Sequence, residues 1–169
     1  MIIRFAETAD FPSILELWNI AIRETEATFE SIEKTLDGLT SLIEERRAKG
    51  HATFVAEDDG VVIGFSTYSQ FRGGTGYTHT MEHTINVAAK ARGRGAARAL
   101  MRAVEDHAEE AGAHIIIAGV SSGNPDGVTF HARMGYTEIA HLREVGRKWG
   151  GWRDLILMQK VLSPSEGTL

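Results

Sequence analysis

The segment that most limits the fold runs from residue 77 to residue 120, where two strand patterns enclose a glycine-containing loop and a long helix pattern. Residues 77–87 have strand character and end in the apolar pair Ile85 and Val87. Residues 115–120 are a continuous apolar run of strand length. Between them, residues 95–111 repeat apolar side chains at helical spacing, and Gly112 follows as a terminator. The expected inner face of that helix consists of Ala96, Leu100, Ala103, Val104, His107 and Ala111. This succession of strand, helix and strand predicts a mixed α/β fold.

The remaining patterns extend this unit into one sheet with flanking helices. Asp10 is a good N-cap for a helix that begins at Phe11-Pro12. Asn124 and Pro125 start a short helix that ends before Gly135. Strands are expected at residues 2–5, 53–57, 61–68, 136–144 and 152–162. The resulting order is β-α-α-β-β-β-α-β-α-β-β.

Two further segments complete this outline of the chain. Residues 35–49 form a second helix that ends at Gly50, and its expected inward side chains are Leu36, Leu39, Leu42 and Ile43. Asp59-Gly60, between two apolar runs, is typical of a β-hairpin turn. Residues 71–76 read as a flexible loop.

Length and composition indicate one ordinary globular domain. The chain has 169 residues, of which 43% are hydrophobic and 24% charged. We expect one domain over residues 1–162 and a polar tail over residues 163–169. The net charge of −5 argues against a general nucleic-acid binder, which needs a basic face.

Cysteine content and the hydrophobic runs bear on the compartment. The chain has no cysteine, which excludes disulfides, cysteine-based metal sites and a cysteine nucleophile. The N-terminus lacks the pattern of a secretory signal, and no apolar run approaches the length of a membrane span. The expectation is therefore a cytoplasmic protein without a membrane partner.

The loop Arg92-Gly93-Arg94-Gly95-Ala96-Ala97 carries the clearest chemical signal. The first turn of a helix presents unpaired N–H groups and the positive end of the helix dipole, and glycines let that backbone approach a ligand. Five basic residues lie in or near the loop in an acidic chain, which points to an anionic ligand: Lys90, Arg92, Arg94, Arg98 and Arg102.

Several classes of protein use such a loop. A P-loop needs Gly-Lys-Ser/Thr, which is missing here. A Rossmann fingerprint needs glycine or alanine where Arg98 stands and a carboxylate at the end of the next strand, and neither is present. A plain glycine-bearing helix start with surface arginines remains an alternative.

The pattern Arg/Gln-x-x-Gly-x-Gly/Ala, read here from Arg92 to Ala97, resembles the acyl-CoA site of the GNAT superfamily of N-acetyltransferases. Over residues 3–162 the chain resembles the phosphinothricin and methionine sulfoximine acetyltransferase branch. The residues that carry this likeness are Phe29, Phe71-Arg72, residues 77–84 with Glu82-His83, Asn124, residues 130–136, residues 142–148 and residues 152–159. The resemblance implies a mostly antiparallel mixed sheet flanked by helices.

The resemblance also implies acetyl-CoA as co-substrate, without a metal. Its diphosphate would lie on the amides of the segment Gly93, Arg94, Gly95, Ala96, Ala97 and Arg98, next to Arg92. The pantetheine arm would run beside Ile85, Asn86 and Val87. The amide of Asn124 suits a pantetheine amide, and it equally suits a helix cap.

Two residues are the catalytic candidates. A substrate ammonium must lose a proton before it attacks the thioester, and Glu82, which resembles the family's glutamate at this position, is the expected base. His131 stands where many GNAT enzymes have a tyrosine. It is expected either to donate to the leaving sulfur or to hydrogen-bond the cofactor, with a packed structural histidine as the alternative.

The resemblance implies a substrate site built around the loop after residue 70. Arg72 is the expected bidentate clamp for a substrate carboxylate. The full expected set is Phe29, Arg72, Gly74, Thr75, Gly76, Tyr77, His79 and Glu82. Arg147 and Lys148 add positive charge there or are surface cations. Gly73 to Gly76 and Gly127 depart from the branch pattern, which leaves the acceptor open.

The leading hypothesis is an acetyl-CoA-dependent N-acetyltransferase that acts by direct attack of the amine of a small amino acid or analogue of the phosphinothricin, methionine sulfoximine or methionine sulfone type. The alternatives are a non-catalytic acetyl-CoA sensor and a protein or peptide N-acetyltransferase. The branch resemblance implies a homodimer, and Trp149 and Trp152 near a late strand agree with that, because interface cores are rich in aromatic residues.

Overall fold

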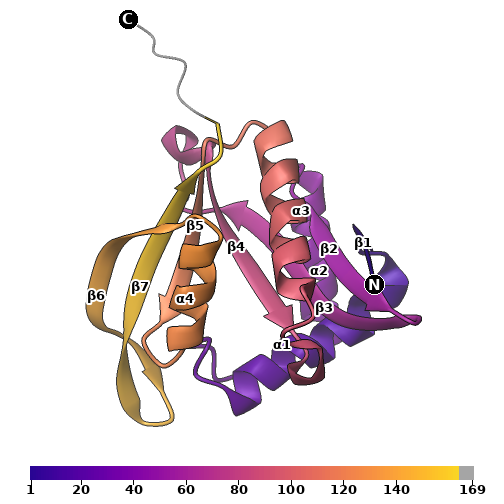
Figure 1. The fold of residues 1–169 in the computed structure, drawn as a ribbon, viewed down its shortest axis with the longest axis horizontal. Coiled ribbons are helices and arrows are strands. Elements are labelled where there is room, and N and C mark those ends of the chain that lie inside the picture. The colour runs from indigo at the N-terminus through magenta and orange to yellow at the C-terminus, as the bar shows by residue number, and fades with distance from the viewer. Residues whose placement is uncertain (164–169) are drawn as a thin grey trace, which may run out of the picture.

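The computed structural model describes residues 1–163, which form a seven-stranded sheet with helices on both faces (Figure 1). In sheet order the strands are β1 (Ile2–Phe5), β2 (Thr53–Asp58), β3 (Val61–Gln70), β4 (Thr80–Val87), β5 (Ile115–Ser121), β7 (Gly151–Val161) and β6 (Thr137–Lys148). The β4–β5 pair is parallel and the other neighbouring pairs are antiparallel. This confirms the predicted mixed, mostly antiparallel sheet. Residues 164–169, which hold most of the predicted polar tail, lie outside the described residues.

Helices α1 (Phe11–Glu24) and α2 (Leu36–Ala48) cover one face of the sheet, and α3 (Ala96–Glu110) and α4 (Pro125–Arg133) cover the other (Figure 1). The first face buries Ile14 and Leu39 against Phe65 of β3. The second face buries Leu100 of α3 against Ile116 of β5. Within residues 1–163 no helix has both the length and the apolar character that a membrane crossing requires.

Several element boundaries and faces differ from the sequence prediction. β4 begins at Thr80 instead of residue 77, because Thr75–Tyr77 forms a short 3-10 turn before it. Leu36, expected to face inward, is the first residue of α2 and is 43% exposed, whereas Leu39 and Ile43 are buried. In α3, Met101 is fully buried although the predicted face omits it.

Asp10 does not cap α1 with its side chain, which corrects a second expectation. Its carboxylate accepts two hydrogen bonds from the guanidinium of Arg4, at 2.6 and 2.8 Å, and one from the backbone N–H of Glu7. The Asp10 side chain therefore stabilises the start of the preceding 3-10 turn, Thr8–Asp10, instead of the start of α1.

The hairpin at Asp59-Gly60 is confirmed, and both residues adopt positive φ values, 50° and 77°. This geometry matches the twist of the flanking strands.

The feature that positions the functional site is the short contact between β4 and β5. They pair only from Thr80 with Ile115 to Glu82 with Ile117. Beyond that point β4 stays paired with β3, β5 stays paired with β7, and the two strands separate (Figure 1). The sheet therefore opens into a cleft in its middle.

Candidate functional site

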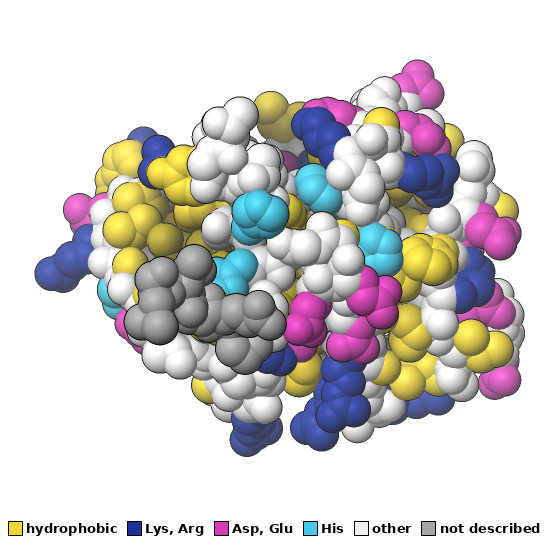
Figure 2. All heavy atoms as spheres, turned by 90° about the horizontal axis from the view of Figure 1, so that it is seen from above, with side chains coloured by type: hydrophobic (Ala, Val, Ile, Leu, Met, Phe, Trp, Pro, Cys, Tyr) yellow, Lys and Arg dark blue, Asp and Glu magenta, His cyan; other side chains and the backbone are white. Residues whose placement is uncertain are grey.

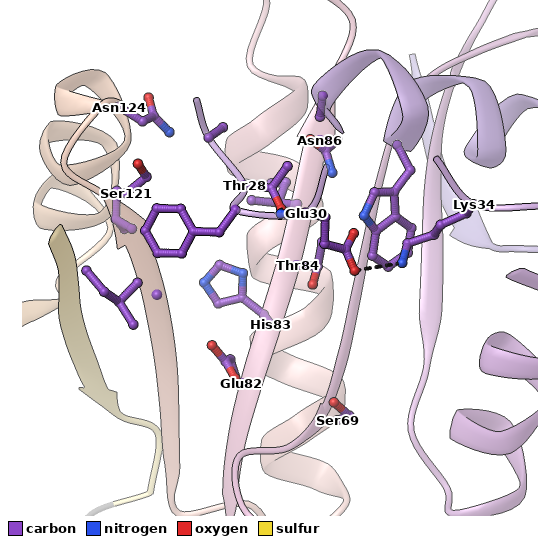
Figure 3. Close-up of a pocket in the computed structure, with 18 of the residues that line it drawn as sticks. Thr28, Glu30, Lys34, Ser69, Glu82, His83, Thr84, Asn86, Ser121 and Asn124 are labelled. Atoms are coloured by element: carbon purple, nitrogen blue, oxygen red, sulfur yellow. Dashed lines mark hydrogen bonds and ion pairs between the residues drawn. The ribbon is translucent and has the colours of Figure 1, made fainter. Parts of the chain in front are cut away.

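A cavity of about 490 Å³ occupies the cleft between β4 and β5 (Figure 3). One wall is β4, which contributes Glu82, His83 and Thr84, and the opposite wall is β5 with Ser121. The segment 25–35, between α1 and α2, crosses the cavity with Thr28, Phe29 and Glu30. Lys34 at the end of that segment bonds Glu30 at 3.0 Å and stacks its ammonium over Trp18.

Glu82 is half-buried, and its carboxylate reaches across the cleft toward β5. A Cβ placed on Gly119 would lie 3.1 Å from Oε1 of Glu82, so the glycine leaves the space that this side chain uses. Burial raises the pKa of Glu82, and the nearby cation Arg46 opposes that rise. A carboxylate with increased proton affinity inside a cavity is suited to general-base chemistry.

His131 of α4 lies beside His83 of β4, with the rings stacked and their centroids 5.1 Å apart. Nδ1 of His131 is 2.7 Å from the carbonyl oxygen of Gly127, which can only accept, so this nitrogen carries the proton. Nε2 of His131 then accepts from Nε2 of His83 at 3.2 Å. Burial lowers the pKa of His131 and lowers that of His83 to about 3. Both rings are therefore neutral at pH 7, and the ring nitrogens of His131 are both engaged within the chain.

Asn124 precedes α4 and accepts a hydrogen bond from the backbone N–H of Gly127 at 3.1 Å, which confirms its role as a cap. It also lines the cavity, together with Ile85 and Asn86 of β4 (Figure 3). The capping and ligand-binding alternatives for Asn124 are thus compatible in one conformation.

The segment from Arg92 to Arg98 follows β4 and includes the first three residues of α3. Gly93 and Gly95 have φ values of 75° and 86°, a region that side chains disfavour, and Gly95 precedes the first residue of α3. The first amide of the helix with a backbone partner is that of Ala99, which donates to Gly95 at 3.0 Å. The preceding amides of the helix start are thus available to an anion. The guanidinium of Arg94 bonds the carboxylate of Asp58 at 2.5 Å.

A second cavity of about 490 Å³ adjoins the first, and the two share Leu42, Arg46 and Ser69 in their linings. Arg72 and Gly74 line only this second cavity. The guanidinium of Arg72 lies over the ring of Tyr77, 5.8 Å from its centroid.

The structure does not bring every predicted substrate residue to the cavities. Thr75, Gly76, Tyr77 and His79 line neither the first nor the second cavity. His79 hydrogen-bonds the carbonyl oxygen of Gly112 at 2.7 Å, because it lies next to the C-terminal end of α3. That end of the molecule faces the viewer in Figure 2, where histidine side chains gather on the surface.

Lys148 is not a surface cation, which was one of the two expectations for it. It is only 1% exposed, and its ammonium donates to the carbonyl oxygens of Ile22 and Glu30, each at 2.5 Å. Burial lowers its pKa. Lys148 therefore attaches the end of β6 to the segment that walls the cavity. Its neighbour Arg147 is exposed and lies over the ring of Trp152.

Arg46 is the main residue that the sequence analysis missed. It belongs to α2, is half-buried, and donates to Oγ1 of Thr67 at 3.1 Å. The available signal was its spacing, since Leu39, Leu42 and Ile43 were expected to face inward and residue 46 lies on the same helix face.

Within residues 1–163, no group of three or more potential ligands is arranged to hold a metal ion. The sequence profile of the Acetyltransferase (GNAT) family matches residues 14–136. The chain belongs to this family. This GNAT acetyltransferase is therefore an enzyme of the acyltransferase class, and the cleft between β4 and β5 lies within the matched region.

Individual relatives agree along nearly the whole length. An L-methionine sulfoximine/L-methionine sulfone acetyltransferase of Salmonella typhimurium is 34% identical over 162 residues, which cover 96% of this chain and 95% of the relative. A solved acetyltransferase from Salmonella typhimurium with its cofactor acetyl-CoA has a TM-score of 0.94 at 32% identity, covering 98% and 96% of the two chains. A phosphinothricin acetyltransferase from Sinorhizobium meliloti in complex with acetyl-CoA has a TM-score of 0.92 at 28% identity, covering 98% and 94%.

Proposed function

We propose that this GNAT acetyltransferase transfers the acetyl group of acetyl-CoA to the amine of a small amino acid or amino-acid analogue of the methionine sulfoximine, methionine sulfone or phosphinothricin type. The observation that carries the proposal is Glu82, a carboxylate of raised pKa in a cavity of about 490 Å³ between separated strands. The named relatives act on such amino-acid analogues or contain acetyl-CoA, which supports the same assignment.

The donor side of the site fits acetyl-CoA. The helix start at Gly95 and the positive φ of Gly93 leave backbone amides available for a diphosphate. The edge of β4 beyond Glu82 has no pairing with β5, so it is available to the amides of a pantetheine arm, next to Asn124. We assign cofactor binding to Ile85, Asn86, Val87, residues 92–98 and Asn124.

The chemistry follows from the position of Glu82. An alkylammonium has a pKa of about 10.4, so at pH 7 a base must remove a proton before the nitrogen can attack. Glu82 takes that proton, directly or through a water, and the amine nitrogen then bonds to the acetyl carbon. Bound acetyl-CoA supplies this carbon as a thioester. The bonded nitrogen loses one further proton, which ends on sulfur as the free thiol of CoA once the C–S bond has broken to release a thiolate. Since thiols have a pKa of about 8.5, that departure needs little acid assistance. We assign His131 a positioning role in the cavity wall instead of proton transfer to sulfur, because both of its ring nitrogens are bonded within the chain, to Gly127 and His83.

We extend the proposal to a homodimer in the cytoplasm. The hairpin of β6 and β7 exposes several large apolar side chains, which are Ile139, Leu142, Val145, Trp149 and Trp152. A second copy of the chain would cover them, and sedimentation of the purified protein measures whether it does. The cysteine-free composition is compatible with a reducing compartment.

The decisive experiment is an acceptor screen that measures release of free CoA with a thiol reagent. The chain has no cysteine, so the protein adds no background to this assay. We expect release with methionine sulfone, methionine sulfoximine or phosphinothricin. Binding of acetyl-CoA in calorimetry without turnover on any amine would instead identify a sensor. Release only with peptides would identify a protein-modifying enzyme.

A further inference from the structure

Arg46 lies where the two cavities meet, and it is the cation of α2 that lines both. It follows the buried residues Leu39 and Ile43 on the inward face of the helix, which brings a charged side chain to a position where apolar packing is usual. Such a position is costly for a guanidinium unless it has a partner.

The guanidinium of Arg46 has few of the hydrogen-bond partners that a buried charge needs. A guanidinium has five N–H donors. Within residues 1–163, the guanidinium of Arg46 donates one hydrogen bond, to Oγ1 of Thr67 at 3.1 Å. Arg4 shows the contrast, because it holds the carboxylates of Asp10 and Glu57 with two hydrogen bonds each.

Two opposite charges in the lining of the first cavity, Glu82 and Arg46, are not bonded to a charged partner within residues 1–163. Lys34 is matched by Glu30 at 3.0 Å. Glu82 and Arg46 attract one another electrostatically, but in the described part of the chain they form no hydrogen bond or ion pair with each other. Burial lowers the pKa of Arg46, as expected for a desolvated cation that lacks a bonded carboxylate. One open anion and one open cation in a shared cavity match the two charges of an amino acid.

We propose that Arg46 binds the α-carboxylate of the acceptor while Glu82 faces its ammonium group, so that the amino acid lies between these two charges. This inference rests on the proposed function and names the group that selects the acceptor. Arg72 is the competing candidate, but it lines only the second cavity and is exposed over Tyr77. A planar guanidinium binds a carboxylate through two parallel hydrogen bonds, which a substrate carboxamide cannot reproduce.

The test compares L-methionine sulfone with its carboxamide, which keeps the amine and the side chain and removes the negative charge. Both are assayed with wild type, Arg46→Gln, Arg46→Lys and Arg72→Gln. Arg47→Gln is the matched control, because Arg47 is the next residue of α2, is exposed and bonds Glu44. Circular dichroism and acetyl-CoA affinity by calorimetry establish that each variant is folded.

We expect Arg46→Gln to lower kcat/KM for the acid by about 10- to 150-fold, the loss typical of a hydrogen bond between charged groups, with the carboxamide changed by less than about threefold. Arg46→Lys should recover part of the loss, and Arg47→Gln should match wild type. An equal loss for acid and carboxamide, or loss of acid preference in Arg72→Gln alone, would overturn the assignment. Absence of turnover with any amino acid in wild type would instead refute the proposed function.

Discussion

Replacing Lys148 with methionine tests how the acceptor wall is held. Methionine is similar in length but cannot donate, so Lys148→Met removes the hydrogen bonds to the carbonyl oxygens of Ile22 and Glu30, each 2.5 Å long. Both carbonyls belong to the end of α1 or to the segment after it. The change therefore detaches this segment from β6 without altering a residue of the cleft itself.

The expected cost follows from those two bonds. Hydrogen bonds to charged groups contribute about 1.5–3 kcal/mol each, or about 3–6 kcal/mol together. Burial of the ammonium offsets part of this, as the lowered pKa of Lys148 indicates, which leaves a net loss of about 2–4 kcal/mol. For a chain of this size, each kcal/mol shifts Tm by about 2–4 °C. We expect a decrease in Tm of about 4–16 °C, together with a higher KM for the amine, because Phe29 and Glu30 lose their fixed positions.

Thermal unfolding followed by circular dichroism and steady-state kinetics measure the two effects. Arg147→Met is the matched control, since Arg147 is the exposed neighbour of Lys148 on the same strand, and surface substitutions stay within about 0.5 kcal/mol. If Lys148→Met melts within 1 °C of that control, the two hydrogen bonds do not stabilise the fold. If it is destabilised but binds the amine as wild type does, the segment does not need this attachment to form the acceptor wall.

Substitutions at three other residues examine the cleft. Glu82→Gln should lower kcat by about 10²–10⁴-fold at unchanged acetyl-CoA affinity. In wild type, kcat/KM should rise with pH through a midpoint above the ordinary pKa of a glutamate, because burial raises the pKa of Glu82 and only the deprotonated form accepts a proton. If Glu82→Gln turned over as fast as wild type at every pH, Glu82 would be excluded as the base. Gly119→Ala should lower kcat several-fold to about 10²-fold with little change in Tm, since its Cβ would lie 3.1 Å from Oε1 of Glu82, and unaltered kcat would contradict this tight fit. Asn124→Ala should lower the stability by about 1 kcal/mol through loss of the cap and should raise the KM for acetyl-CoA. Asn124→Asp should keep the cap and raise only that KM. A normal KM for acetyl-CoA in both variants would limit Asn124 to capping.

The elements that carry the proposed donor half of the site can be predicted from the sequence because their signals are local. The helix that follows Gly95 and the apolar strand Ile115–Ser121 have clear periodicity and clear ends. The glycines of the loop reflect backbone angles that other residues disfavour. These features lie within about 30 residues of one another, so spacing alone places them together.

The acceptor half could not be predicted as well because it depends on contacts between distant segments. Lys148 and Ile22 are 126 positions apart, and nothing in the residues around Lys148 distinguishes a buried donor from a surface cation. Arg46 had a usable signal in its helical spacing, but the role that we propose for it depends on Glu82, which lies on β4 and is distant in sequence. The substrate roles expected for Thr75, Gly76, Tyr77 and His79 came from the family resemblance. In the structure, Thr75–Tyr77 forms a 3-10 turn, and these residues line neither the first nor the second cavity.

The separation of the site into a donor half and an acceptor half indicates where the specificity of this enzyme for its amine is expected to reside. Three attachments hold the segment 25–35 to the β6–β7 hairpin. Arg153 bonds Glu26, the ring of Phe29 packs where Gly146 has no side chain, and Lys148 bonds the carbonyl of Glu30. A side chain at residue 146 would collide with that ring, so the hairpin dictates how closely the segment covers the cavity. The donor half uses none of these contacts. Substitutions in the hairpin should therefore alter which amine is accepted while leaving acetyl-CoA binding intact, and substitutions in the 92–98 loop should do the reverse.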